Sequence, residues 1–288
     1  RRLFEMLVPN KLQQDACFIV MGSEGRSEQI LPTDQDNALI LRDGRDVEPI
    51  MPACCAITGA LIDIGYPRCP GEIMISNPSW VLTQSAFRAR LSQWIASSSN
   101  DDVMNLAIFF DAEAVAGDEH LLSDVKAAVF EEAASSDAFC ARFASAINAF
   151  PVPIGMFSRL RLDRSGELAG TLDIKKGGVF PIVHGIRALA LQNKLTTTPT
   201  LNRIEALVDL RTIDERFARE VVEAFRFMCT VRAECGLAAI DCGMPATNRL
   251  RPDTLTHIDQ EILAESLQVV VRLRRLVGQK FRLDLLGL

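Results

Sequence analysis

Apolar residues in the first half of the chain fall into short runs separated by turn residues. The runs at 16–21 and 37–42 are bounded by polar and turn residues, which is typical of buried strands. The stretch 52–64 is apolar and contains alanine, so we expect a helix that stops at Gly65. A shorter run at 73–76 predicts another strand. These patterns together predict a small mixed sheet with helices packed on it.

The second half of the chain is mostly helical in its periodicity. Thr212 and Glu215 have the spacing of a capping box, and Gly236 is expected to end the helix that follows. Apolar residues recur at helical spacing in four segments, which are 139–150, 201–208, 217–228 and 258–281. We therefore expect an α+β chain with two domains, a sheet-containing domain over 1–138 and a helical bundle over 139–288.

The polar residues around the second predicted strand are the most informative ones. A Gly22-Ser23 turn follows the first strand, and Asp34 and Asp36 belong to the second. Alternate side chains of a strand point to the same face, so the two carboxylates are expected to project together. Hard divalent cations such as Mg²⁺ bind carboxylate oxygens together with phosphate oxygens. The N–H groups of the glycine turn and the serine hydroxyl are suited to hold phosphate.

A metal clamp beside a phosphate cradle is the apparatus of nucleotidyl or phosphoryl transfer. The pattern therefore predicts Asp34 and Asp36 as catalytic metal ligands, and Gly22 and Ser23 as nucleotide-binding residues. The alternative is a pair of turn carboxylates that cap a helix and bind no ligand.

Further residues are candidates for this site, and each also has an alternative role. Arg26 is suited to clamp a triphosphate because its guanidinium is always charged and fork-shaped, but an ion pair with Glu24 or Glu28 is the alternative. A site with two metal ions needs a third acid. We select Asp111, with Glu72 as the other candidate, although Asp111 is equally suited to cap a helix.

One candidate lies in the second half of the chain. Lys175 and Lys176 precede two glycines, and this arrangement predicts a contact with nucleotide phosphates, Lys175 being the residue we select. The alternative is a basic turn on a solvated edge.

Composition narrows the class of protein. The hydrophobic content of 48% indicates a folded core, and the net charge of −6 argues against nucleic acid as a main partner. The eight cysteines form no C-x-x-C pair and the three histidines are widely separated, so no zinc site is predicted. No apolar run reaches the ~20 residues of a membrane span. We expect a cytoplasmic protein with reduced thiols, and the start at Arg1 suggests a piece of a longer protein.

The stretch GSEGRSEQILPTDQDNALIL closely resembles a nucleotidyltransferase domain that occurs beside CBS and cyclic-nucleotide-binding domains in bacterial signalling proteins. This family is catalogued as domain of unknown function 294 and has its own helical C-terminal companion. Further pieces match in order along the chain, and they are GYPRCPGEIMISNPSW, IFFDAEAVAGDEHLL, LDIKKGGVFPIVHGIRALAL and TLNRIEAL. The resemblance implies a nucleotidyltransferase fold followed by a helical domain, and fusion to CBS or cyclic-nucleotide-binding domains.

The chain is more distantly similar to the PII uridylyltransferase and glutamine synthetase adenylyltransferase group. By that resemblance Gly22, Ser23, Asp34 and Asp36 take the nucleotide and metal roles, and the acceptor is a protein side chain. One departure is that those enzymes carry an arginine-aspartate pair after the lysine and glycines, where this chain has GGVFPIVHG.

The sequence thus predicts an Mg²⁺-dependent enzyme, with two ions, that moves a nucleoside monophosphate from an NTP to a hydroxyl on a signalling protein. Three other classes stay open. They are a nucleotide-sensing module without turnover, a nucleotidyltransferase that acts on a cationic small molecule, and a purely structural interaction domain.

Overall fold

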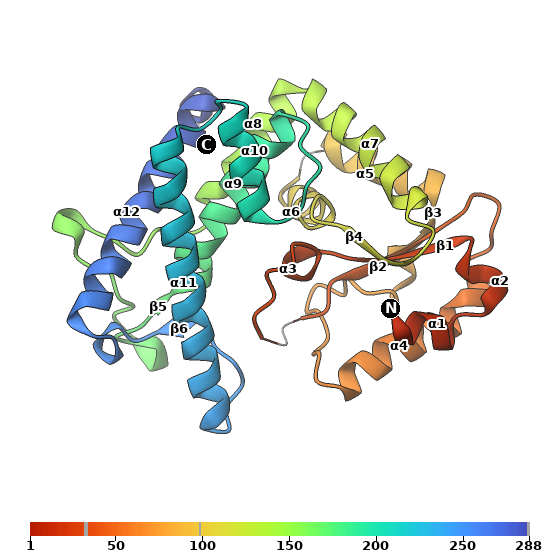
Figure 1. The fold of residues 1–288 in the computed structure, drawn as a ribbon, viewed down its shortest axis with the longest axis horizontal. Coiled ribbons are helices and arrows are strands. Elements are labelled where there is room, and N and C mark those ends of the chain that lie inside the picture. Colours follow the sequence, from red (N-terminus) through yellow and green to blue (C-terminus); the bar gives the residue numbers. More distant parts are fainter. Residues whose placement is uncertain (32–33, 98, 287–288) are drawn as a thin grey trace. The chain divides into compact units, whose positions relative to one another are not determined.

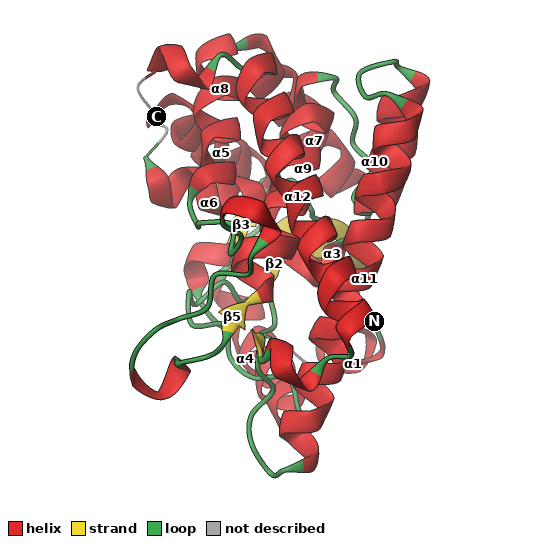
Figure 2. Ribbon diagram, turned by 90° about the vertical axis from the view of Figure 1, so that its left-hand side faces the viewer, coloured by secondary structure: helices red, strands yellow, loops and turns green. Residues whose placement is uncertain are grey.

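The computed structural model describes residues 1–31, 34–97 and 99–286. The chain divides into two compact units, an N-terminal unit of residues 1–139 with 196–199, and a C-terminal unit of 140–195 with 200–288. The sequence placed a boundary after residue 138 but did not indicate that 196–199 belongs to the first unit. Helices dominate and strands are few (Figure 2), so the chain is α+β, as predicted.

A four-stranded mixed sheet forms the centre of the N-terminal unit. Its strand order is β3 (Val81–Thr83), β2 (Asn37–Leu41), β1 (Ala16–Val20) and β4 (Glu113–Gly117). Strand β1 pairs antiparallel with both β2 and β4, whereas β2 and β3 run parallel. The two strands predicted on either side of the Gly-Ser turn are confirmed.

Helices cover both faces of this sheet, which explains why β1 and β2 are buried at every position and almost entirely apolar. On one face lie α1 (Arg2–Leu7) and α4 (Met51–Asp63), and Phe4 of α1 stacks on Phe18 of β1 with ring centroids 6.1 Å apart. The helix expected over 52–64 is therefore present. All residues of β1 and β2 are buried, as for strands covered on both sides.

The other face is covered by α5 (Gln84–Ser97) and α7 (His120–Ser135), and α6 (Asn100–Phe109) packs against α5 (Figure 1). Two short helices, α2 (Asn10–Gln13) and α3 (Gly22–Gly25), flank β1. The apolar faces of α5, α6 and α7 thus complete the second half of the core.

The predicted strand at 73–76 is wrong, because these residues form a bent loop and the strand next to β2 is β3. The backbone N–H of Asn37 donates to the carbonyl of Ile73, and the Asn37 side chain accepts from the N–H of Ile75, at 3.0 and 2.9 Å. A side chain thus takes the place of one ladder bond. Strand β4 was not predicted, since its half-exposed edge sequence carries no strong apolar pattern.

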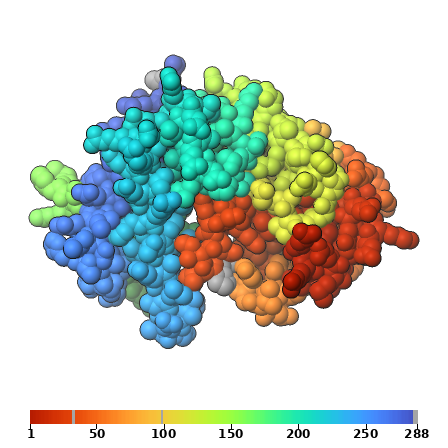
Figure 3. Space-filling view, in the orientation of Figure 1, coloured from red at the N-terminus to blue at the C-terminus, as the bar shows by residue number. Residues whose placement is uncertain are grey.

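The C-terminal unit is built from long helices and a two-stranded antiparallel sheet of β5 (Leu172–Asp173) and β6 (Arg249–Leu250). Helices α11 and α12 pack along each other and lie side by side in the space-filling view (Figure 3). The helices of this half are α8 (Asp137–Ser145), α9 (Phe180–Gln192), α10 (Thr200–Asp209), α11 (Glu215–Asp241) and α12 (His257–Lys280).

Two local predictions in this half are wrong. The N-cap of α11 is Asp214, whose carboxylate accepts from the N–H of Phe217 at 3.1 Å, whereas Thr212 donates to Asn193. Asp214 is better placed than Thr212 to cap the helix, because it directly precedes the first turn. Helix α11 also continues through Gly236 to Asp241, and Gly236 is buried within its C-terminal part. The last helix agrees with its prediction within one residue at each end.

Within the described ranges, every helix is too short or too polar to cross a lipid bilayer.

Candidate functional site

The turn after β1 places a glycine where a side chain would collide with an aspartate. Gly22 has a φ of +57°, in the left-handed region that favours glycine. A Cβ atom on Gly22 would lie 2.7 Å from Oδ2 of Asp36. The Asp36 carboxylate therefore lies directly against the Gly22 backbone, and the two predicted motifs meet in space.

The second glycine of α3 fixes this turn to the rest of the unit. A Cβ atom on Gly25 would overlap the carbonyl oxygen of Asp111 and lie 2.8 Å from the carbonyl oxygen of Val20. Both neighbours are backbone atoms, which cannot rotate away as a side chain can. Helix α3 thus packs backbone to backbone on the segment that joins α6 to β4.

A buried ion pair reinforces the same contact. Arg26 Nη1 lies 2.5 Å from Oδ2 of the fully buried Asp111, and Arg26 Nε lies 2.7 Å from Glu28 Oε2. Burial by itself lowers the pKa of the Arg26 guanidinium, but the charges of Asp111 and Glu28 more than offset it, and the pKa is raised. The ion pair of Arg26 with Glu28, which the sequence suggested as an alternative, is present. The pair with Asp111 was not predicted.

The two aspartates of the motif precede β2 and do not lie within it, which corrects the prediction that the strand carries them. Regular pairing starts at Asn37, although the Asp36 carbonyl still accepts from the N–H of Met21 at 2.8 Å. Asp34 is exposed, Gln35 is buried and Asp36 is half-buried. The alternation expected of an extended segment is therefore present.

The loop that follows α4 supports this segment from its other side. The carbonyl of Pro67 accepts from the N–H of Gln35 at 3.3 Å, and that of Ile73 accepts from Asn37. The buried Cys69 thiol hydrogen-bonds the Asp36 carboxylate, and burial, followed by this bond, raises the pKa of Cys69 to about 11. Cys69 is thus a protonated donor to Asp36, and the only feature of the sequence that marks this position is the turn-forming Pro-Gly that follows.

Glu24 is a second residue of the site that was not predicted, because the sequence suggested it only as an ion-pair partner for Arg26. It is half-buried, and its pKa is raised by burial and by the negative charge of Asp36. Negative charge therefore accumulates around Asp36. Among the residues described, no group of three or more His, Cys, Asp or Glu side chains is arranged to hold a metal ion by itself.

The remaining predicted residues lie elsewhere. Asp111 is the partner of Arg26, and Glu72 is exposed in the loop beside Asp36, with a φ of +53°. Lys175 is exposed in the C-terminal unit, where it begins a single π-helical turn, Lys175–Val179, ahead of α9. Such turns occur frequently at functional sites. The structure thus joins Gly22 to Asp36 and Arg26 to Asp111 within one unit.

Two family models match the chain. The model described as "Putative nucleotidyltransferase DUF294" matches residues 1–101, which include the Gly-Ser turn, Arg26 and both aspartates. The model described as "Putative nucleotidyltransferase substrate binding domain" matches residues 137–281, half of the chain. Asp111 falls between the two matches. No curated protein matches the chain.

Replacing Arg26 should destabilise the N-terminal unit far more than breaking an exposed ion pair. Arg26→Gln leaves the fully buried Asp111 carboxylate without its cation, and we expect the free energy of unfolding to fall by about 3–5 kcal/mol. Arg45→Gln, the control, breaks the half-exposed pair with Asp15 and should cost less than about 1 kcal/mol. Urea unfolding curves measure both, and equal losses would contradict the importance of the buried pair.

The two glycines of α3 should respond differently to alanine. Gly25→Ala meets immovable backbone atoms and is expected to prevent folding of the unit, as circular dichroism would show. Gly22→Ala should fold, at a cost of about 1–2 kcal/mol for the left-handed residue plus the displacement of Asp36. In an Asp36→Ala background the cost of displacing Asp36 should vanish, so Gly22→Ala should destabilise the unit less there. An equal cost of Gly22→Ala in both backgrounds would argue against the contact between Gly22 and Asp36.

Glu24 should make stability depend on pH. Because its pKa is raised in the folded state, its contribution to stability is full below the ordinary value of 4.5 and is lost as the pH rises through the folded pKa. The difference in free energy of unfolding between wild type and Glu24→Gln should therefore shift against wild type from pH 4.5 upward. Urea unfolding of both proteins across this range measures it, and a constant difference would refute the shift.

Proposed function

Because the chain belongs to the family of nucleotidyltransferase substrate-binding domains, we propose that it transfers a nucleoside monophosphate from an NTP to a hydroxyl acceptor. The observation that carries the proposal is the Asp36 carboxylate seated against the left-handed Gly22. This contact puts an acid that is suited to bind a metal beside a turn whose N–H groups can bind phosphate.

The residues around Asp36 fit a hard divalent cation. Asp34 and Asp36 offer carboxylate oxygens. The pKa of Glu24 is raised by burial and then by the negative charge of Asp36, a charge that a cation would neutralise. Mg²⁺ commonly binds one or two carboxylates and takes its other ligands from phosphates and water, so a complete protein cage is not required. We propose Asp34 and Asp36 as the ligands of two Mg²⁺ ions. When bound, they would neutralise the charge on the transferring phosphate.

The other residues of the site bind and position. Gly22 N–H and the Ser23 hydroxyl would orient the triphosphate, and Lys175 is proposed as a further phosphate-binding residue. Arg26 would act mainly by holding α3 in place, because its guanidinium already pairs with Asp111 and Glu28. For the same reason we assign Asp111, first expected as a third metal ligand, to the positioning of Arg26.

In the proposed transfer, one bond to the α-phosphorus forms and one breaks. The acceptor oxygen forms a bond to the α-phosphorus, the bond from that phosphorus to the bridging oxygen of the β-phosphate breaks, and pyrophosphate leaves. The acceptor proton passes to solvent. Orientation of the acceptor and the triphosphate should supply most of the rate, as in other phosphoryl transfers.

Two acceptor classes follow from different arguments. The distant resemblance to PII uridylyltransferase favours a hydroxyl of a signalling protein. A small cationic molecule is the second candidate, favoured by an acidic cavity in the C-terminal unit.

The aspartates should be required for both nucleotide binding and turnover. With Mg²⁺, we expect the wild type to bind one of ATP, UTP, GTP or CTP and to release pyrophosphate. Asp34→Asn/Asp36→Asn should lower both by at least about a hundredfold, since even supporting residues of metal sites cost 10–100-fold. Calorimetry and a pyrophosphate assay provide the measurements.

The matched control is Asp46→Asn, an exposed aspartate beyond the far end of β2, which should behave as wild type. Binding of an NTP without pyrophosphate release, even with cell extract as a source of acceptor, would favour a nucleotide sensor instead. Failure of the wild type to bind any NTP would refute the proposed site.

A further inference from the structure

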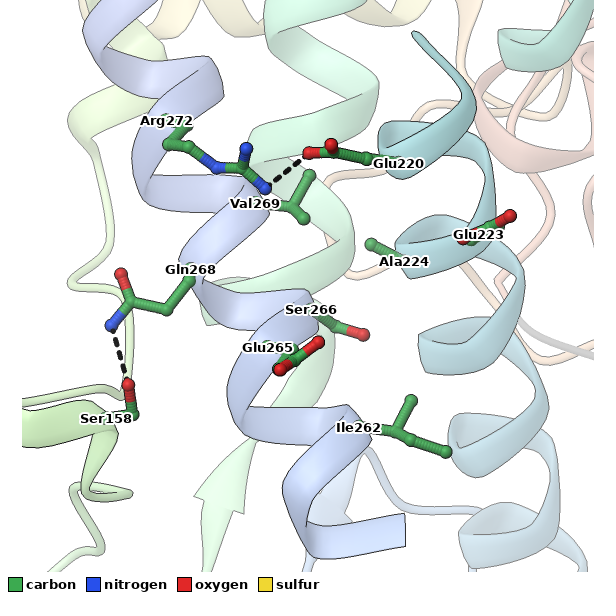
Figure 4. A pocket seen from close by; sticks show the side chains of 10 residues that line it. All are labelled: Ser158, Glu220, Glu223, Ala224, Ile262, Glu265, Ser266, Gln268, Val269 and Arg272. Carbon is green, nitrogen blue, oxygen red and sulfur yellow. Dashed lines mark hydrogen bonds and ion pairs between the residues drawn. The ribbon is translucent and has the colours of Figure 1, made fainter. Parts of the chain in front are cut away.

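The C-terminal unit contains a cavity of about 530 Å³ between α11 and α12 (Figure 4). This volume lies within the range of small-molecule sites. All of its lining residues belong to the C-terminal unit, so the cavity does not depend on the N-terminal unit.

Part of the cavity wall is apolar. Ala224 on α11 and Val269 on α12 are buried, and Ile262 is 41% exposed although its side chain points toward α11. A wall of this kind offers contacts to an aliphatic chain of a ligand, which would remove Ile262 from water.

One buried polar group points into the cavity. Ser266 is only 4% exposed, and its hydroxyl points from α12 toward α11 in Figure 4. Within the described part of the chain, the Ser266 side chain has no hydrogen-bond partner. Its oxygen is not sealed from solvent, so the hydroxyl is open toward the cavity and is suited to hydrogen-bond a polar group of a ligand at this depth.

The residues that line the cavity carry more negative than positive charge. Glu220 is compensated, because Arg272 Nη2 lies 2.6 Å from its Oε2 and Arg216 Nε lies 3.6 Å from its Oε1. The contact with Arg272 is an ion pair without hydrogen-bond geometry. Glu223 on α11 and Glu265 on α12 have no such cation among the described residues. The cavity therefore carries an excess of negative charge.

This charge suits an organic cation better than a metal ion. Three glutamates line the cavity, yet among the described residues no group of three or more His, Cys, Asp or Glu side chains is arranged to hold a metal ion. An ammonium group needs no converging ligands, and an attached alkyl chain would use the apolar wall.

We propose that the cavity binds a small aliphatic amine. Its ammonium groups would face Glu223 and Glu265, its chain would contact Ile262 and Val269, and a polar group would hydrogen-bond Ser266. Where such an amine also carries a hydroxyl, that hydroxyl is the acceptor of the nucleotidyl group, an assignment that rests on the proposed function, whereas binding of the amine does not.

The test uses the full chain and two probes of equal length, 1,6-diaminohexane and 1,6-hexanediol, in calorimetry without nucleotide or Mg²⁺. We expect the diamine to bind at least about tenfold more tightly, because only it carries positive charge. Glu223→Gln/Glu265→Gln should weaken diamine binding about tenfold. Ser266→Leu should abolish binding by filling the cavity, with circular dichroism confirming the fold.

The matched control is Glu234→Gln/Glu261→Gln, which removes one exposed carboxylate from each of the same two helices outside the cavity lining. This variant should bind the diamine as wild type does. The proposal is overturned if the diamine does not bind, if both probes bind equally, or if the two double variants weaken binding to the same extent.

A final arm separates this proposal from the proposed function. Asp34→Asn/Asp36→Asn should bind the diamine unchanged, since those residues lie in the other unit. With NTP and Mg²⁺, 6-aminohexan-1-ol should stimulate pyrophosphate release by the wild type. If the diamine binds but this alcohol causes no release above the basal rate, the amine site stands and its assignment as acceptor is refuted.

Discussion

The buried pair of Arg26 and Asp111 is the interaction on which the candidate site depends. A guanidinium is tolerated in the interior only if its charge is matched, and here Asp111 and Glu28 match it at 2.5 and 2.7 Å. Since Asp111 lies between α6 and β4, the pair ties the turn after β1 to a segment 85 residues away. Gly25 permits the backbone contact that accompanies it, and together they fix the orientation of Gly22.

The fixed turn allows acidic side chains to gather where repulsion would otherwise separate them. Asp36 is held against Gly22 on one side and by the Cys69 thiol on another, while burial and the nearby charge of Asp36 raise the pKa of Glu24. A flexible loop would relieve this repulsion by moving. The rigid arrangement keeps it, so the free energy gained on binding a cation is correspondingly larger. Preorganisation of this kind is what phosphoryl transfer requires of a protein.

The sequence predicted those parts of the fold that local patterns determine. Strands β1 and β2, predicted at 16–21 and 37–42, are buried throughout because helices cover both of their faces, and the last helix keeps its period over its whole length. The predicted strand at 73–76 is absent because the Asn37 side chain accepts a hydrogen bond from the backbone of Ile75. An apolar pattern in the sequence cannot indicate such a bond. For the site, the motif indicated the turn and the acids. It could not indicate that Arg26 and Asp111 meet, because nothing local links residues so far apart.

The two units differ in how firmly their acidic residues are positioned, and this difference suits different tasks. Around Asp36, positions are set by a glycine without room for a side chain and by a buried ion pair, which gives the small tolerances that bond making and breaking demand. Glu223 and Glu265 instead stand exposed on two helices, where their side chains can adjust. Adjustable carboxylates recognise charge without demanding a fixed geometry. The acceptor site that we propose can allow that freedom, because the bonds that change are made at the nucleotide and not at the ammonium group of the acceptor.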